Sequence, residues 1–532
     1  MVPYNANCAQ NIAPSNKSQD WRWFAGWLCL SGAAVAMLFS VRALPFYDYY
    51  EWLFQGNLVA QLLFGVPGAG EPTDNLYGLR PVPVPNLGAP LLIGLLNVAL
   101  PIELAGRLFV AITVLAFAYA FAYFVRAVQG RPTVIEFAGF LFGLGFFLYK
   151  GYLSYLFGLS LALIIMGKIH KLAARSDGAP NRPALSYLAL MGMVLYLSHL
   201  MAWSVAVLAT LLYSFALFQR QQHRPAALLV LTLLPAGLLL IWYTLAERSG
   251  IGVSAYDSWK DKVHAVVEPL QLFVRLEPFP TSFPIFWANL GFGLALLALL
   301  LPNVDRTALR TALRDRPALW LGGLLAATAL LLPIENLNGL NRPDGRFVLP
   351  AFLAIVAALP YRAFRAGRGT SVIGLVALCF GLHIVEYSAI GSRIDRVDAV
   401  TNATIPTGSP ILHVAIRSGS GCTPAFGPSV GVNTLKWFVV DYALESGQAR
   451  LNFDETSFVH SRFDKNSPGV TVLAPAPKDI AAEIRPPLQA YPYPYVQAIG
   501  CPKDLATVEL TLASHYDPIR RSDGITILRR RD

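Results

Sequence analysis

Charged residues are scarce in this chain of 532 residues. Asp, Glu, Lys and Arg make up 14% of it, hydrophobic residues make up 55%, and the mean hydropathy is +0.48. Soluble domains usually carry about a quarter charged residues, so this composition excludes an ordinary water-soluble enzyme. Apolar runs of roughly 15 to 23 residues recur from Trp21 to about Ser388, and most are long enough to cross a bilayer. The sequence therefore predicts a mainly α-helical, polytopic membrane protein.

Several chemical signatures are also absent. We find no glycine-rich phosphate loop, no internal repeat and no long low-complexity tract. The five cysteines fit no metal-binding spacing; they are Cys8, Cys29, Cys379, Cys422 and Cys501. A transporter built from inverted repeats would show internal symmetry in the sequence, and the lack of a clear repeat argues against one.

Positive charge is concentrated in the apolar part of the chain. From Ile390 to Asp532 there are 15 Lys and Arg against 14 Asp and Glu, so this part contributes +1 of the net +10 and the rest carries +9. Basic clusters lie in the connections 168–182, 220–224, 306–316 and 362–368. Cytoplasmic loops of membrane proteins are enriched in Lys and Arg, so we interpret this charge as a topology signal and predict no nucleic-acid partner.

The basic clusters constrain the number of crossings. Twelve apolar segments can be counted, at about 23–41, 85–102, 105–127, 133–149, 151–168, 184–198, 200–218, 225–246, 283–302, 317–333, 345–361 and 370–388. The clusters fall on one side only if one early segment does not cross. Segment 85–102 is the best candidate, because it begins with the helix-hostile stretch RPVPVPNLGAP. About 11 spans remain.

This topology divides the chain into three parts. Residues 1–21 form a cytoplasmic tail, and residues 22–389 form a transmembrane domain whose first extracytoplasmic loop covers about 42–104. We read the first apolar segment as an uncleaved span. Residues 390–532 form an extracytoplasmic domain in which ILHVAI, KWFVV, YVQAIG and ITILRR are typical of strands, while KDIAAEI and LATVELTLASHY suggest helices or mixed segments. An α/β or α+β domain is expected.

Polar residues of unusual placement fall on the predicted outer face. Asp48 and Glu51 follow the first span in RALPFYDYYEW, Lys150 interrupts FFLYKGYLSYLFGL, and His199 interrupts YLSHLMAW. A further charged group, in NGLNRPDGRFVLP, consists of Arg342, Asp344 and Arg346. Separate apolar segments thus present sparse polar groups on one surface, as a single site would require.

Each of these residues also has a structural interpretation. Asp48 and Glu51 fit an N-terminal cap of an amphipathic helix, Lys150 can extend to the membrane interface, and His199 can be a hydrogen-bonded turn residue. The stretch NRPDGR is a good turn by itself. In the functional interpretation, Asp48 is a general base and the basic residues hold a phosphate group.

The layout resembles that of the GT-C glycosyltransferases, polytopic enzymes that take sugars from polyprenyl-phosphate carriers. An acid just after the first span, a first loop with interfacial helices, about 11 spans and an outer C-terminal domain carry the resemblance. VPNLGAPLL, PIELAGRLFVA, YKGYLSYLFGLSLAL and YLSHLMAWSV also look like a group of uncharacterised bacterial membrane proteins with this layout. Residues 40–220 are covered, with an echo at GRFVLPAFL. Glu51-Trp52 stands where that group has an Asn-His pair.

The resemblance implies a sugar transfer at the outer face of a bacterial inner membrane. Asp48 would take a proton from the acceptor, which is a glycan, a lipid or a protein, and Glu51 would assist it. If a divalent cation (Mg²⁺ or Mn²⁺) neutralises the carrier phosphate, Glu51 becomes a candidate ligand. The alternative is a transporter or lipid-handling protein without chemistry. In either case Cys422 and Cys501 lie in an oxidising compartment, which suggests a disulfide between them.

Overall fold

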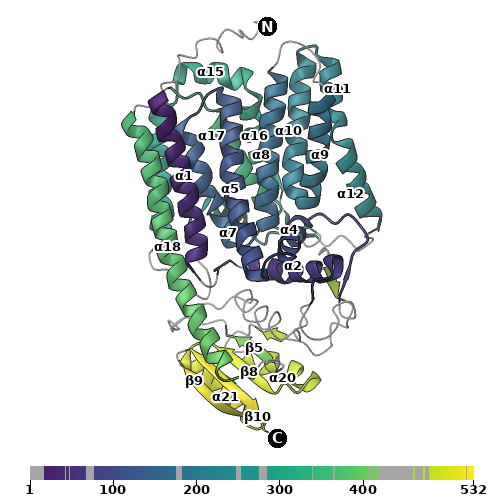
Figure 1. Cartoon of the computed structure of the whole chain (residues 1–532), viewed down its shortest axis with the longest axis vertical. Helices are drawn as coiled ribbons and strands as arrows, with labels where there is room; N and C mark the ends of the chain where they lie inside the picture. The colour runs from purple at the N-terminus through teal and green to yellow at the C-terminus, as the bar shows by residue number, and fades with distance from the viewer. Residues whose placement is uncertain are drawn as a thin grey trace.

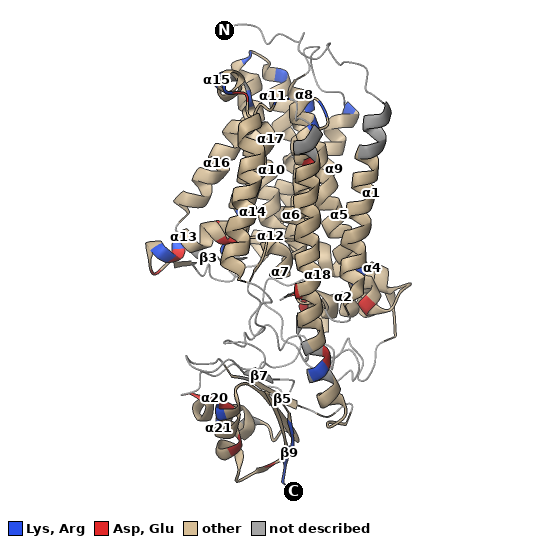
Figure 2. Cartoon of the chain, turned by 90° about the vertical axis from the view of Figure 1, so that its left-hand side faces the viewer, with Lys and Arg blue, Asp and Glu red and all other residues tan. Residues whose placement is uncertain are grey.

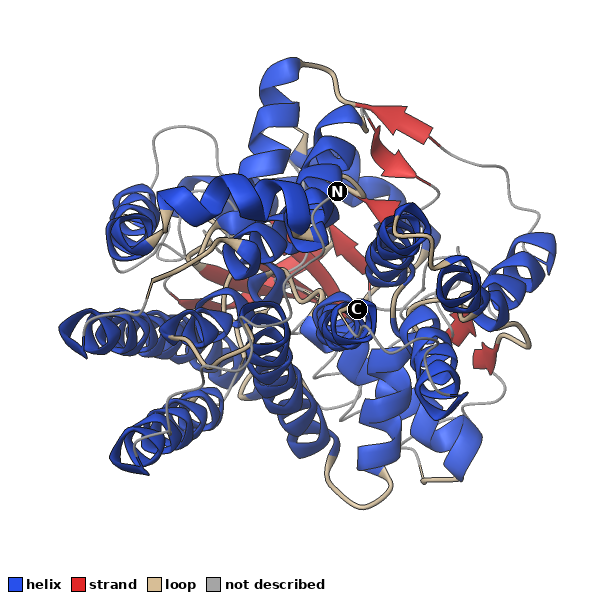
Figure 3. Cartoon of the chain, turned by 90° about the horizontal axis from the view of Figure 1, so that it is seen from above, coloured by secondary structure: helices blue, strands red, loops and turns tan. Residues whose placement is uncertain are grey.

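The structure is a computed structural model of the whole chain. It describes residues 17–41, 44–46, 48–67, 77–174, 182–246, 253–274, 284–332, 334–337, 340–362, 366–406, 409, 411–416, 459–461, 471–473, 479–522 and 524–531. Most of these residues are helical, and the helices run roughly along the long axis, with a small mixed β-sheet near the C-terminus (Figure 1). Seen from above, the bundle lies over the strands (Figure 3).

Seven helical segments are long and apolar enough to cross a membrane. They lie in α1 (Lys17–Ser40), α5 (Ile102–Gln129), α8 (Leu153–Ala173), α10 (Leu200–Gln219), α11 with α12 (His223–Leu231 and Leu234–Ala246), α14 with η4 (Ile285–Leu300 and Leu301–Asn303) and α18 (Ala366–Asn402). Many of their large apolar side chains face outward, as lipid contact would require. The prediction of a multi-pass helical membrane protein is confirmed at this level.

Other predicted spans form shorter helices. They are η2 (Val134–Phe137), α6 (Ala138–Gly143) and α7 (Phe146–Tyr149) in one segment, α9 (Arg182–Ser198), α16 (Pro317–Leu331) and α17 (Gly345–Ala358). The count of 11 spans therefore stays a prediction. The segment expected not to cross forms α4 (Gly88–Asn97), whose ten residues extend about 15 Å, half of a hydrocarbon core.

Helix α17 lies at the centre of the bundle. It packs against α16, α5 and α10, and most of its side chains are buried. Close packing depends on small residues, since a Cβ on Gly322 of α16 would lie 3.1 Å from the carbonyl oxygen of Ala351. The first turn of α17, which carries Arg346, is thereby fixed relative to the neighbouring helices.

Different short helices lie at the two ends of the bundle. At one end lies α15 (Arg306–Asp315), capped by Asp305, whose carboxylate accepts from the backbone N–H of Thr307 (Figure 1). At the other end lie α2 (Tyr49–Phe64), α4, α7 and α13 (Trp259–Val267) with η3 (Glu268–Leu270) (Figure 2). The middle of the bundle is almost devoid of charge (Figure 2).

The C-terminal sheet has the strand order β7-β5-β8-β10-β9. Its strands are β5 (Ile411–Ala415), β7 (Thr471–Leu473), β8 (Tyr495–Ile499), β9 (Tyr516–Ser522) and β10 (Ile525–Arg530). β5 is parallel to β7 and β8, whereas β10 is antiparallel to β8 and β9. Helices α20 (Ile480–Ala490) and α21 (Pro502–Leu512) pack on one face.

Most of the strand predictions can be compared with this sheet. ILHVAI, YVQAIG and ITILRR form β5, β8 and β10, while KWFVV lies outside the described residues. KDIAAEI begins α20, and LATVELTL lies in α21. The sequence did not indicate β9, which reads YDPIRRS and has six exposed positions of seven.

Two features connect the outer parts to the bundle. α18 continues to Asn402, so the predicted domain boundary at 389 falls inside a helix. The change in composition there marks a change of surroundings along one helix. β1 (Tyr77–Leu79), from the first loop, pairs antiparallel with β6 (Val459–Ser461).

A third sheet is small and has the strand order β2-β3-β4. It joins β2 (Val253–Ala255) to β3 (Ile334–Leu337) and β4 (Leu340–Asn341).

Candidate functional site

Asp48 lies against the connection between α7 and α8. Gly151, in this connection, has φ +71°, and a side chain there would collide with the backbone nitrogen of Asp48. Only glycine adopts this conformation without strain and permits so close an approach. Trp52, one turn into α2, donates from Nε1 to the carbonyl oxygen of Gly151 at 2.8 Å. The start of α2 and the residues around Lys150 therefore form one unit.

Asp48 occupies the N-cap position of α2, but its side chain makes no capping hydrogen bond. The carboxylate of Asp48 therefore does not cap the N-terminus of α2, contrary to the structural interpretation. Glu51 is the third residue of α2 and is half-buried. Helix α2, which begins with these two acids, lies at the end of the bundle nearest the C-terminal domain (Figure 1).

Tyr152 connects Asp48 with Arg346. The guanidinium of Arg346 lies 4.8 Å from the centre of the Tyr152 ring and 5.9 Å from that of Tyr155. Burial raises the pKa of Tyr152, the nearby Arg346 opposes this, and the Asp48 carboxylate adds to it. The Tyr152 hydroxyl is thus within electrostatic reach of both Asp48 and Arg346.

Among the described residues, the buried cation Arg346 has no carboxylate partner. Its exposed fraction is 7%, and among the described residues it forms no ion pair with a carboxylate. Its Nε has no hydrogen-bond partner in the same part of the chain. Buried charges in proteins are normally paired, because an isolated one is costly to remove from water. The position is therefore suited to an anion that the described residues do not supply.

His199 strengthens this conclusion. It caps α10, and its Nδ1 accepts from the backbone N–H of Met201 at 3.1 Å. Its Nε2 lies 2.9 Å from a terminal guanidinium nitrogen of Arg346. Burial, reinforced by Arg346, holds the pKa of His199 well below its usual range, so the imidazole is neutral.

A neutral imidazole has one acceptor nitrogen, yet both nitrogens of His199 face donors. Arg346 carries donors only, so its 2.9 Å contact with Nε2 fixes the guanidinium against His199. The Nε–H of Arg346, which has no partner among the described residues, remains available to an anion.

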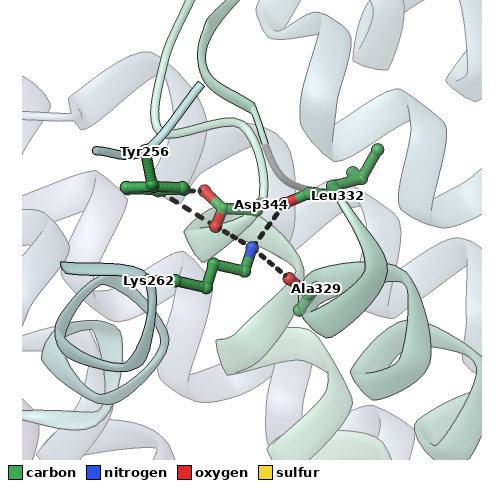
Figure 4. Close-up of polar contacts among 5 residues, drawn as sticks. All are labelled: Tyr256, Lys262, Ala329, Leu332 and Asp344. Carbon is green, nitrogen blue, oxygen red and sulfur yellow. Dashed lines mark hydrogen bonds and ion pairs between the residues drawn. The ribbon is translucent and has the colours of Figure 1, made fainter. Parts of the chain in front are cut away.

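Asp344, two residues before Arg346, has a different environment. Its carboxylate is fully buried, pairs with Lys262 of α13 and accepts from the hydroxyl of Tyr256 at 2.8 Å (Figure 4). Lys262 also donates to the carbonyl oxygens of Ala329, at 2.6 Å, and Leu332, at the end of α16. The sequence suggested a substrate contact for Asp344, whereas its observed contacts fix the start of α17.

The structure separates the remaining predicted residues. Arg342, at φ +48°, forms an ion pair with Glu268 and lies in a turn, as its sequence context suggested. Lys150 lies next to Gly151, with its ammonium group 5.8 Å from the centre of the Phe146 ring. Asp48, Lys150, His199 and Arg346 thus gather around Gly151, Tyr152 and Tyr155, while Asp344 and Arg342 make ion pairs beside them.

Two further predictions concern a metal and a disulfide. Within the described residues, no group of three or more His, Cys, Asp or Glu side chains is arranged to hold a metal ion. Cys501 is disulfide-bonded, while Cys29 and Cys379 are free thiols. Cys422 lies outside the described residues, so its pairing with Cys501 stays a prediction.

Sequence reasoning missed several residues of this region. Tyr152 and Tyr155 stand in an aromatic stretch without a distinguishing feature, and Lys262 is one of several charges in its loop. Gln55, a buried amide on α2, had a usable signal, because it follows Glu51 by one helical turn. Compared with known proteins, the chain matches no family model, and no curated protein qualifies as its relative.

Proposed function

We propose that the protein is a membrane glycosyltransferase that moves a sugar from a polyprenyl-phosphate carrier to an acceptor hydroxyl. The observation that carries the proposal is Arg346, a buried guanidinium that has no carboxylate partner among the described residues and lies over the ring of Tyr152, which is also within electrostatic reach of Asp48. A cation that can bind a phosphate and a carboxylate that can accept a proton, both near one residue, are what such a transfer needs.

The proposed reaction assigns one step to each side. Asp48 accepts the proton of the acceptor hydroxyl, whose oxygen attacks the anomeric carbon of the sugar. The bond between that carbon and the phosphate oxygen breaks, and the electron pair leaves with the carrier phosphate. Arg346, whose guanidinium is held in place by His199, stabilises the negative charge that remains on the phosphate. The products are the glycosylated acceptor and the polyprenyl phosphate.

The proposed orientation has the N-terminus in the cytoplasm of a bacterium and the site on the outer face of the inner membrane. Support comes from the placement of the basic helix α15 at the end opposite α2 and the C-terminal domain (Figure 1). A cysteine introduced at Arg310 of α15 should react with an impermeant thiol reagent only after the cells are permeabilised. Labelling in intact cells would overturn this orientation.

The decisive experiment compares two substitutions of Asp48. Asn preserves the size of Asp and caps a helix equally well, but it cannot act as a base. We expect Asp48→Asn to accumulate normally and to reduce sugar transfer by on the order of 10²-fold or more. Asp48→Ala removes the carboxylate together with most of the side chain, and it serves as the reference for a structural defect.

The assay measures transfer from polyprenyl-phosphate monosaccharides by purified protein in lipid. Full activity of Asp48→Asn would show that the acid is not the base. The same anion site would also serve a transporter or lipid-handling protein. A wild-type protein that binds these carriers but transfers no sugar would favour that alternative.

A further inference from the structure

Within the part of the chain that the structure describes, Gln55 is a buried amide without hydrogen-bond partners. Its exposed fraction is 1%, and within the described part of the chain neither Oε1 nor Nε2 has a hydrogen-bond partner. A buried polar group that makes no hydrogen bond costs about 1–3 kcal/mol. Asn57, two residues later, shows the usual arrangement, because its Oδ1 accepts from Nδ2 of Asn97 at 3.1 Å. Among the described residues, the amide of Asn57 thus has a partner, whereas that of Gln55 has none.

The position of Gln55 on α2 places it beside the candidate site. Residues 48, 51, 52 and 55 follow the spacing of one helix face. On this face Trp52 contacts Gly151, and Val59 packs against Gly94 of α4, where a Cβ would lie 2.8 Å from Val59 Cγ1. Gln55 lies between these contacts, on the face that carries Asp48 and Glu51.

We propose that the amide of Gln55 binds the hydroxyl groups of the sugar on the lipid carrier. This inference rests on the proposed function and deepens it. An amide offers two N–H donors and a carbonyl acceptor in one plane, and adjacent sugar hydroxyls offer the matching acceptor and donor. A bound sugar would therefore satisfy both ends of Gln55 at once.

The helical geometry of α2 determines the distance between Asp48 and Gln55. Seven residues of helix separate Asp48 from Gln55, which corresponds to about 10 Å along the axis. That spacing is comparable to the length of one sugar ring, with a carboxylate at the reacting end and an amide at the opposite edge. Arg346 holds the phosphate, Asp48 faces the acceptor, and Gln55 selects the sugar.

The test uses two probes, a polyprenyl phosphate without sugar and the same carrier bearing a hexose. Binding of each to purified wild-type protein, Gln55→Met and Gln61→Met is measured by titration in nanodiscs. Met has nearly the length of Gln and no amide. Gln61, on the same helix and on a different face, provides the matched control.

We expect Gln55→Met to bind the bare carrier as the wild type does and to lose roughly 10- to 100-fold of the affinity for the hexose-bearing carrier. Its thermal midpoint should stay the same or rise, because an apolar side chain replaces an unsatisfied amide. Gln61→Met should leave both affinities unchanged.

Three outcomes would overturn the inference. They are equal losses for both carriers, no loss for either, and a lower thermal midpoint of Gln55→Met, which would indicate a structural role for the amide. The readout separates this inference from the proposed function. If the sugar-dependent loss occurs but the wild type transfers no sugar, the transferase proposal fails and the role of Gln55 stands. If the wild type binds neither carrier, both fail.

Discussion

The two ends of the helix bundle treat the same kinds of side chain differently. Near α15, Arg126 donates two hydrogen bonds to Glu136, at 2.8 and 2.6 Å, and Gln129 donates to the carbonyl oxygens of Ala357 and Leu359. At the other end, the buried guanidinium of Arg346 has no carboxylate partner and the buried amide of Gln55 has no partner within the described residues.

This difference shows where the fold gives up stability. Buried polar groups in native proteins nearly always find partners, and the exceptions need a specific explanation. The bundle satisfies an arginine and a glutamine at one end. At the other end, within the described residues, an arginine without a carboxylate partner and a glutamine without a hydrogen-bond partner therefore indicate a site. Functional sites are where local consistency is expected to fail.

The largest effect is expected at Lys262. It lies at the same end as Arg346, but it is paired with the fully buried Asp344. Lys262→Met leaves that carboxylate without its cation, so the free energy of unfolding should fall by about 3–5 kcal/mol. Chemical unfolding in mild detergent measures the change.

A double variant separates the effect of the buried charge from the effect of the packing of Lys262. Replacing both partners, in Lys262→Met with Asp344→Asn, should recover most of the loss, because no buried charge remains. If the double variant is as unstable as the single one, the packing of Lys262 and not its charge holds the start of α17.

An intermediate effect is expected for substitution of Arg346, and it concerns sugar transfer and not stability. Arg346→Met removes a cation that has no carboxylate partner within the described residues. The free energy of unfolding should change little, because relief from burying the charge offsets the loss of contact with Tyr152 and Tyr155. Sugar transfer should fall by on the order of 10²-fold.

The comparison between Arg346→Met and Lys262→Met is the sharpest form of this test. A large loss of stability in Arg346→Met would mean that the guanidinium is a structural element. Normal transfer by a stable Arg346→Met protein would remove Arg346 from the proposed site. Arg346→Lys, which keeps the charge but loses the planar fork, should show an intermediate transfer rate.

The smallest effect is expected at Gln129, the counterpart of Gln55. Gln129→Met leaves two carbonyl oxygens without a donor, so the free energy of unfolding should fall by about 1–2 kcal/mol. Thermal unfolding followed by fluorescence can resolve such a change. Because Gln55→Met is expected to cost nothing, equal destabilisation of the two variants would remove the difference between the ends.

Strong periodic and compositional signals were readable from the sequence. Long apolar runs indicated the membrane helices, proline spacing indicated that 85–102 is too irregular for a long helix, and alternating apolar residues located β5, β8 and β10. The gathering of Asp48, Lys150 and His199 followed from placing each at the same end of an apolar segment. These are local properties, each carried by a short stretch of chain.

Long-range partners were not readable in this way. Nothing local to Asp344 reveals that Lys262, 82 residues earlier, neutralises it. The contrast between Asp344 and Arg346, two residues apart, depends on which helix end each side chain meets. Likewise, the burial of Gln55 depends on the elements that pack against α2, chiefly α4 and α5, which the sequence of α2 does not contain.

The length of α18 determines how the C-terminal domain is rotated about the axis of this helix, because each residue of a helix turns the chain by about 100°. Its 37 residues extend about 55 Å, and the membrane-length stretch ends at Ser392, ten residues before the helix does. Because β6 must also meet β1, the domain is held at two points. Inserting one residue after Ser392 would turn everything beyond it by about 100°, away from β1. Inserting seven would restore the angle to within about 20°, but it would displace the domain by about 10 Å. Neither insertion keeps both the angle and the height at which β6 reaches β1.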